Sequence, residues 1–192
     1  MLAYSSIENM GILIIGLALG GIGTLASIIH LIGHSLIKAS FFLTSGNILK
    51  IYSTKKIKSV SGLMQIDPKT GWLWILSFIG IAAFPPSILF ISEFFLIKTM
   101  FLQNKILMAI IFFLLLTIIL FGLAKAVIKM TYSTLTTDKE PEIKSNLKKL
   151  SISMYLPQII MILLTFIIGV NIPDFISNLI DKIMVYLILI NQ

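Results

Sequence analysis

Residues 24–49 read TLASIIHLIGHSLIKASFFLTSGNIL, an apolar run that contains His30, His34 and Lys38. A bilayer core of about 30 Å needs about 20 apolar residues in a helix, so this run is long enough to cross a membrane. The three titratable side chains are spaced four residues apart, and at about 100° per residue they fall within a wedge of roughly 80°. The run therefore predicts a transmembrane helix with a titratable row along one side.

The overall composition also indicates a membrane protein. Of the 192 residues 57% are hydrophobic, whereas soluble domains rarely exceed about half apolar residues. The absence of cysteine excludes disulfides and cysteine-ligated iron–sulfur clusters within this sequence. The net charge of +7 raises the question of nucleic acid, but the Lys residues lie mostly between apolar runs, which favours charge at a membrane surface. We expect no nucleic-acid partner, no cofactor and no metal.

The apolar runs predict an all-α, polytopic transmembrane bundle of about five to six spans. The runs cover residues 2–19, 24–49, 71–96, 105–130 and 150–170, and residues 173–190 form either a sixth span or an interfacial helix. Pro85 and Pro86 interrupt the third run, and two adjacent prolines remove two backbone donors and break a helix. Broken helices at membrane depth usually line a cavity or an ion path.

The distribution of lysine predicts the orientation of the bundle. If each of the first five runs crosses once, ten Lys residues lie on one side and two on the other. The ten are Lys50, Lys55, Lys56, Lys58, Lys69, Lys129, Lys139, Lys144, Lys148 and Lys149, and the two are Lys98 and Lys105. Basic loops stay preferentially inside, so the start of the chain and both long loops are expected to be cytoplasmic, in an inner or cytoplasmic membrane.

The titratable row is best interpreted as a proton relay. Ionisable groups at membrane depth are costly, and they usually face other helices or a wet cavity. Consecutive members lie one helical turn apart, and His titrates closest to physiological pH, so His30, His34 and Lys38 can pass a proton along. Two alternatives stay open: a polar stripe that only holds helices together, and a zinc site on the two His, which needs further ligands.

Three other ionisable residues lie within apolar runs. Glu93 follows the two prolines by two turns, which indicates a relay carboxylate beside an opened backbone, the alternative being a position near the far interface. Glu8 is either a proton-holding carboxylate or an interfacial one. Lys125 either belongs to the path or extends its ammonium to the interface.

Three motifs occur in order along residues 2–96. They are LAYSSIENMG at 2–11, His30-xxx-His34-xxx-Lys38, and FPP at 84–86 followed by SEF at 92–94. In order and spacing they resemble the antiporter-like proton-conducting membrane subunits of respiratory complex I and of membrane-bound hydrogenases. The first and last motifs look most like the hydrogenase-4 component F (formate hydrogenlyase) branch. Beyond residue 100 the resemblance rests on apolar character and Lys125.

The resemblance implies a fold of two inverted five-helix repeats, each with one broken helix, joined by a central line of Lys, His and Glu. This sequence is similar to the second repeat only, so a fragment or a split subunit is expected. The implied division is a partial proton-conducting transmembrane region over 1–130, a cytoplasmic loop over 131–149 and transmembrane or interfacial helices over 150–192.

The resemblance also implies roles for individual residues. His30, His34 and Lys38 correspond to the central relay, and Glu93 corresponds to the acid at the broken helix. Glu8, on the helix that opens the segment, and Lys125 are weaker relay candidates.

Three functions stay open at this point. The first is a proton-translocating subunit of a redox complex of the hydrogenase or NADH:quinone oxidoreductase type, driven by electron transfer elsewhere, with no catalytic redox site in this sequence. The second is a subunit of a multi-subunit sodium/proton antiporter, which shares the fold. The third is a structural membrane module without transport of its own. Each implies other membrane subunits and the lipid bilayer as partners.

Overall fold

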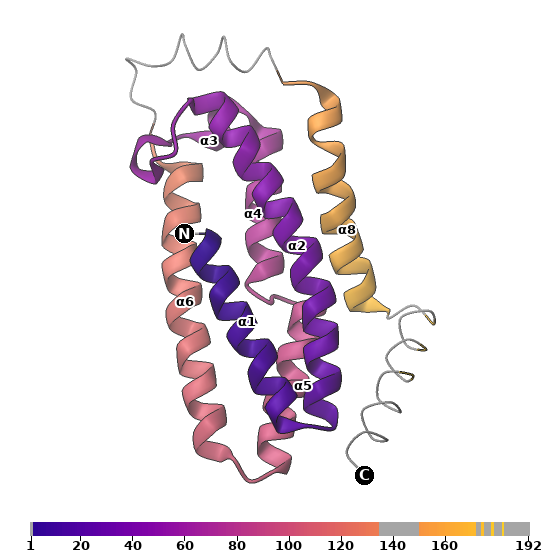
Figure 1. Cartoon of the computed structure of the whole chain (residues 1–192). Helices are drawn as coiled ribbons and strands as arrows, with labels where there is room; N and C mark the ends of the chain where they lie inside the picture. The colour runs from indigo at the N-terminus through magenta and orange to yellow at the C-terminus, as the bar shows by residue number, and fades with distance from the viewer. Residues whose placement is uncertain (1, 135–149, 172–173, 175–177, 179–181, 183–192) are drawn as a thin grey trace.

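The computed structural model describes residues 2–134 and 150–171, together with residues 174, 178 and 182. These residues form a bundle of helices, and no strand occurs among them (Figure 1). The all-α transmembrane fold is therefore confirmed. Most of the predicted loop over 131–149 and most of the segment over 173–190 lie outside the described residues.

The helix bounds agree closely with the apolar runs. The elements are α1 (Leu2–Leu19), α2 (Ile22–Tyr52), η1 (Ile57–Ser59), α3 (Leu63–Ile66), α4 (Pro68–Ile81), α5 (Ile88–Leu102), α6 (Ile106–Tyr132), η3 (Ile152–Met154) and α8 (Leu156–Val170). α6 continues two residues into the predicted loop. Within the described part of the chain, three stretches are long and apolar enough to cross a membrane, Ile22–Tyr52, Ile106–Tyr132 and Ile152–Val170, and α1 is a shorter apolar helix.

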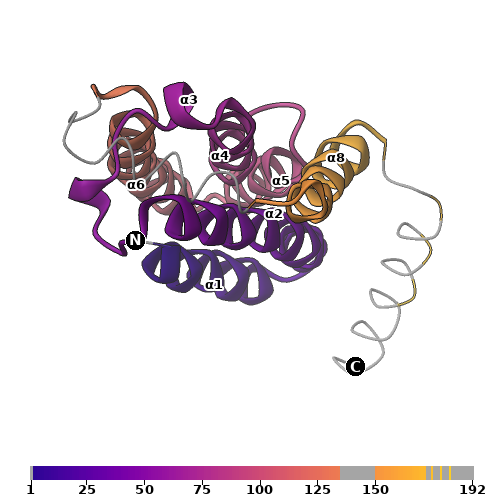
Figure 2. The ribbon, with the colours of Figure 1, turned by 90° about the horizontal axis from the view of Figure 1, so that it is seen from above.

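The long helix α2 is the centre of the bundle. It packs against α1, α4, α5 and α8, and Figure 2 shows it between α1 on one side and α4 with α5 on the other. α6 contacts α4 and α5. Large apolar side chains cover the outside, for example Ile14 on α1 and Phe121 on α6. Such a surface is unfavourable in water and suits hydrocarbon.

The third predicted run is divided into two helices, as its prolines predicted. α4 has 14 residues and α5 has 15, and Pro85 and Pro86 lie between them. Ser87 begins α5: its Oγ accepts the Leu89 amide and donates to the Gly80 carbonyl at 3.0 Å. The break is thus bridged by a serine hydroxyl and not by the regular helical ladder.

Two glycines let neighbouring helices close on the break. A Cβ atom on Gly33 of α2 would clash with Ile88, and one on Gly169 of α8 would clash with the Pro86 carbonyl. α2 and α8 therefore hold the break from two sides.

The two ends of the bundle differ in charge. The segment that joins α2 to α4 holds Lys55, Lys56 and Lys58 and lies at the top of Figure 1, where α6 also ends. The opposite end carries Lys105 in the turn between α5 and α6. We call the first end the Lys-rich end.

Candidate functional site

The titratable row lies inside the bundle. His30 is completely buried, and His34 and Lys38 are 5% and 6% exposed. α1 and α5 supply hydrogen-bond partners for His30 and Lys38, so the wedge predicted on α2 faces other helices and not lipid.

His30 joins three helices through its two ring nitrogens. Its Nδ1 lies 2.9 Å from the Ser92 Oγ of α5, and its Nε2 lies 3.0 Å from the Asn9 Oδ1 of α1. Asn9 donates through its Nδ2 to the Ser5 carbonyl at 2.6 Å. This bond fixes Oδ1 as the atom that faces His30, so the hydrogen-bond network assigns a proton to Nε2.

Ser92 lets His30 exist in two protonation states. The Ser92 Oγ also lies 2.7 Å from the Leu89 carbonyl, which only accepts. When His30 is neutral, Ser92 donates to Nδ1. When Nδ1 is protonated, it donates to Ser92, whose own proton turns to the Leu89 carbonyl. Rotation of one hydroxyl thus satisfies both forms, which a proton relay requires.

The other two members of the row extend it along α2. The rings of His30 and His34 are nearly parallel, with centroids 6.2 Å apart and an interplanar angle of 6°. The His34 Nδ1 is buried and has no hydrogen-bond partner in the described part of the chain. Lys38 donates to the Ser5 hydroxyl of α1, and its Nζ lies 5.5 Å from the centroid of the Phe42 ring. Lys38 is therefore held by a hydroxyl and by an aromatic face.

The two carboxylates lie at a cavity beside the helix break. Glu8 and Glu93 are half-buried and line a cavity of about 550 Å³, together with the break at Ala82–Pro85 and apolar residues of α6. The structure therefore places Glu93 in the second turn of α5, next to the break. Glu8 lies in the same cavity.

The five groups form one electrostatically connected set. Glu93 interacts with Glu8, Glu8 with Lys38, Lys38 with His34, and His34 with His30. Because His30, His34 and Lys38 are buried, a proton that binds to one member changes the energy of the next. The arrangement offers several positions at which a proton could bind.

Other candidates lie apart from this set. Lys125 is exposed on α6. Ser27, which shares the wedge of the row, donates to the Leu13 carbonyl at 2.9 Å and so ties α2 to α1. No cluster of three or more His, Cys, Asp or Glu side chains suited to a metal occurs among the described residues, so the two His lack further ligands there.

Sequence reasoning assigned no role to the partners of the row. Asn9 and Ser92 stand inside the first and third motifs, directly after Glu8 and directly before Glu93. Their contacts with His30 join positions 21 and 62 residues apart, and spacing along one helix cannot reveal them. The position of Ser5, three residues before Glu8, likewise gives no sign of its contact with α2.

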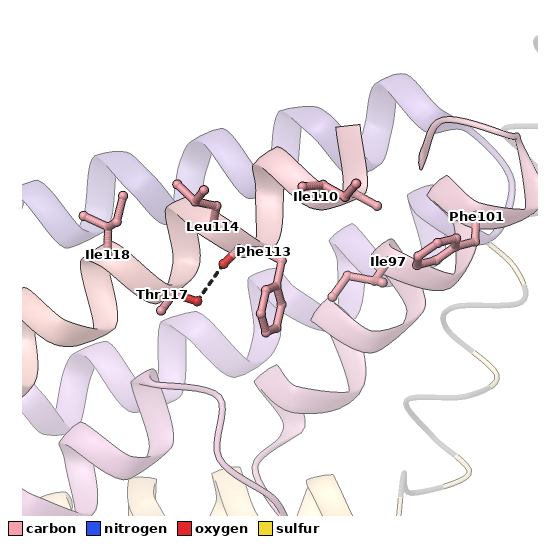
Figure 3. Close-up of a pocket in the computed structure, with 8 residues that line it drawn as sticks. Ile97, Phe101, Ile110, Phe113, Leu114, Thr117 and Ile118 are labelled. Atoms are coloured by element: carbon pink, nitrogen blue, oxygen red, sulfur yellow. Dashed lines mark hydrogen bonds between the residues drawn. The ribbon is translucent and has the colours of Figure 1, made fainter. Parts of the chain in front are cut away.

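An apolar groove between α5 and α6 adjoins the cavity. It has a volume of about 580 Å³, and Ile97, Phe113 and Thr117 line both spaces. Figure 3 shows these side chains with the Thr117 hydroxyl turned back to the Phe113 carbonyl at 2.9 Å. With no charged group in its lining, the groove suits hydrocarbon chains and adds nothing to the titratable set.

Comparison with known proteins identifies the family. Residues 1–120 match the family model described as NADH:quinone oxidoreductase/Mrp antiporter, TM. The chain is 34% identical to the hydrogenase-4 component F homolog of Methylacidiphilum infernorum over 174 residues, which is 90% of this chain and 34% of that protein. It is 30% identical to an Na(+)/H(+) antiporter subunit of Alkalihalophilus pseudofirmus over 170 residues, 88% of this chain and 34% of that protein.

A solved structure shows the same fold. The Mrp complex from Dietzia sp. DQ12-45-1b contains a chain that matches with a TM-score of 0.73 at 19% identity, over 88% of this chain and 39% of that one. The chain thus spans about a third of the length of the curated relatives it matches. The family match confirms the resemblance that the three motifs predicted, and the chain belongs to the NADH:quinone oxidoreductase/Mrp antiporter transmembrane family.

Proposed function

We propose that the chain is a proton-translocating membrane subunit, whole or in part, of a redox complex of the hydrogenase or NADH:quinone oxidoreductase type. The observation that carries this proposal is the set of titratable groups beside a broken helix: the buried His30, His34 and Lys38 and the half-buried Glu8 and Glu93. The 34% identity with a hydrogenase-4 component F homolog supports the type of complex. Other membrane subunits of that complex are its partners.

In this proposal the proton moves along the row in single steps. Lys38 interacts electrostatically with Glu8 and with His34, so its charge influences both. Electron transfer in a partner subunit changes the charge or geometry next to the set, and the proton shifts to the position that has become more favourable. His30 receives it with the hydroxyl rotation of Ser92.

The proposal also includes an orientation. The Lys-rich end faces the cytoplasm, because basic residues near membrane segments are retained inside. The membrane is then the cytoplasmic or inner membrane, and protons cross between the Lys-rich end and the opposite face.

The test is a Lys38→Ala substitution introduced at the chromosomal copy of the gene. Inverted membrane vesicles are supplied with an electron donor, and proton uptake is followed with a pH-sensitive dye. We expect proton uptake to be lost while the complex still assembles, which native gel electrophoresis measures. Lys98→Ala is the matched control, because Lys98 is exposed. Undiminished uptake by an assembled Lys38→Ala complex would refute the relay and favour the structural module.

A second candidate is a subunit of a sodium/proton antiporter. The 30% identity with a known Na(+)/H(+) antiporter subunit favours it, and carboxylates such as Glu8 and Glu93 bind hard cations through oxygen. The same vesicles separate the two functions. Dye responses that require added sodium and occur without an electron donor indicate antiport, whereas responses that require the donor and not sodium indicate a redox-driven pump.

A further inference from the structure

A second group of buried polar side chains lies outside the titratable row, where α2, α4 and α8 meet. Its members are 0–9% exposed, and we call them the polar seam: Ser40 and Asn47 on α2, Asp67, Thr70 and Ser77 at the start and along α4, and Tyr155 and Gln158 at the start of α8. None of them belongs to the set described above. Seven polar residues at one interface of a membrane bundle require an explanation.

The deep part of the polar seam links the three helices. The Ser40 Oγ lies 3.0 Å from the Ser77 Oγ and donates to the Gln158 carbonyl at 3.3 Å. Asn47 donates through Nδ2 to the Gln158 Oε1 at 3.3 Å. These bonds are neutral, and helix association alone would account for them.

The outer part differs because it contains a carboxylate. Asp67 is 5% exposed, and it accepts hydrogen bonds from the Thr70 Oγ1 at 2.5 Å and from the Tyr155 hydroxyl at 2.9 Å. Asp67 precedes α4 at the N-cap position, yet its side chain makes no capping bond to the backbone. Its Oδ2 accepts both hydrogen bonds from the hydroxyls of the seam.

Asp67 is also distinct by its position. Within residues 2–134 and 150–171 the acidic residues are Glu8, Asp67 and Glu93, and Asp67 alone of these lies at the Lys-rich end. A buried carboxylate costs more than a neutral polar group, and holding helices together does not require it. An ionisable group at the mouth of a polar interface is what proton uptake requires.

The seam approaches the row through the helix break. One turn beyond Ser77, the Gly80 carbonyl accepts from the Ser87 Oγ at 3.0 Å, and Ser87 begins the helix that carries Ser92 and therefore reaches His30. On α2 the direct way is closed by Ile37, which packs against Gly80 so closely that a Cβ there would clash. The Ser87–Gly80 hydrogen bond at the break therefore joins polar atoms of α4 and α5 beside the apolar side chain of Ile37.

We propose that the polar seam is a proton access route from the Lys-rich end to His30, with Asp67 as its first acceptor. A hydronium ion at the Lys-rich end gives its proton to the Asp67 carboxylate and becomes water, and the hydroxyls of Tyr155 and Thr70 accept that proton and release their own. The route requires water molecules to enter between the hydroxyl and amide groups farther in and to bridge them, which a polar lining favours. The proton passes Ser77 and Ser87 and arrives at the Ser92–His30 pair.

This inference rests on the proposed function, and its test compares Asp67→Asn with Lys38→Ala in the same vesicle assay. Asp67→Asn keeps the shape and one acceptor oxygen but cannot hold the transferred proton. We expect proton uptake per electron transferred to fall roughly tenfold or more, as for loss of a proton-transfer group, with normal assembly. Asp67→Glu restores the carboxylate and most of the uptake, which a merely structural role of Asp67 does not predict.

A second variant covers the case in which Asp67→Asn does not assemble. Ser77→Ala removes one hydroxyl from the deep part of the seam, and we expect several-fold slower uptake in an assembled complex. Thr131→Val is the matched control, because Thr131 is buried and donates to the Val127 carbonyl of its own helix. We expect it to leave uptake unchanged.

The outcomes separate the two proposals. If Lys38→Ala stops uptake while assembled Asp67→Asn or Ser77→Ala complexes pump like the parent, the seam is structural and this inference is wrong, although the proposed function stands. If Lys38→Ala has no effect, the proposed function fails and the inference falls with it. If Asp67→Glu pumps as poorly as Asp67→Asn, the carboxylate is not the acceptor.

Discussion

Replacing Ser92 by Ala removes the hydroxyl that meets the His30 Nδ1 at 2.9 Å. Ser92 is completely buried on α5, so a small apolar side chain fits without a clash, and the Asn9 contact on the other ring nitrogen remains. The substitution therefore isolates a single hydrogen bond at the innermost member of the row.

The size of the effect follows from the two states of His30. The protonated ring loses a hydrogen bond to a charged group, about 1.5–3 kcal/mol, and the neutral ring loses one between neutral groups, about 0.5–1.5 kcal/mol. The difference, about 1–1.5 kcal/mol against the protonated ring, corresponds to a roughly fivefold to tenfold lower occupancy, since about 1.4 kcal/mol is a factor of ten. If His30 carries the proton, its passage slows by a similar factor.

The assay is proton uptake by inverted vesicles, normalised to electron transfer and to assembled complex. Thr99→Val is the control on the same helix, because Thr99 is buried and donates to the Phe95 carbonyl of α5. In a His30→Gln background, Ser92→Ala should have no further effect, since both changes act on one step. Proton uptake by Ser92→Ala within twofold of the unsubstituted protein would refute this account of His30. Effects of Ser92→Ala and His30→Gln that add independently would also refute it.

Two further predictions concern packing and orientation. Gly169→Ala places a methyl group against the Pro86 carbonyl and the Ile88 amide, so overpacking should lower the free energy of unfolding by about 1–3 kcal/mol, which is measured as a lower unfolding temperature in detergent. Gly122→Ala is the control, because no atom lies within 4 Å of its Cβ, and it should leave the unfolding temperature unchanged. Equal stability of both variants would contradict the packing of α8 on the break. The chain contains no cysteine, so Ser59→Cys at the Lys-rich end and Asn104→Cys at the opposite end can each be labelled alone with an impermeant maleimide. Labelling of Ser59→Cys in inverted vesicles and of Asn104→Cys in intact cells would support the orientation, and the reverse pattern would overturn it.

The helix bounds could be predicted from the sequence because each membrane span requires a long apolar run. α1 has the bounds of its apolar run, and α2 exceeds its run by a few residues at each end. The break between α4 and α5 follows from Pro85 and Pro86, because a missing backbone donor is a local property. The short helices η1 and α3 were not predicted, since they lie in a polar segment without an apolar period.

The hydrogen-bond partners of the row could not be predicted in the same way. Spacing placed His30, His34 and Lys38 on one face of α2, but which helix covers that face depends on tertiary packing. The contacts of His30 with Asn9 and Ser92 need α1 and α5 to flank α2, and close approaches such as the one at Gly33 decide that geometry. The polar seam was missed for the same reason, because Ser, Thr and Asn scattered through apolar runs carry no period of their own.

Charge balance connects the row with the polar seam. With Lys38 charged, Glu8 and Glu93 ionised and both His neutral, the five groups carry a net charge of −1, and a single bound proton makes the set neutral. A net charge in a poorly solvated region is costly, so the set favours one mobile proton. In the route that we propose, a second proton that arrives at His30 through the seam makes the set positive, and repulsion then favours release of the first one from the carboxylates in the cavity. The proposed function thus couples uptake at one end with release at the other without any large movement of the helices, and Glu93→Gln, which neutralises one carboxylate, should uncouple the two in the vesicle assay.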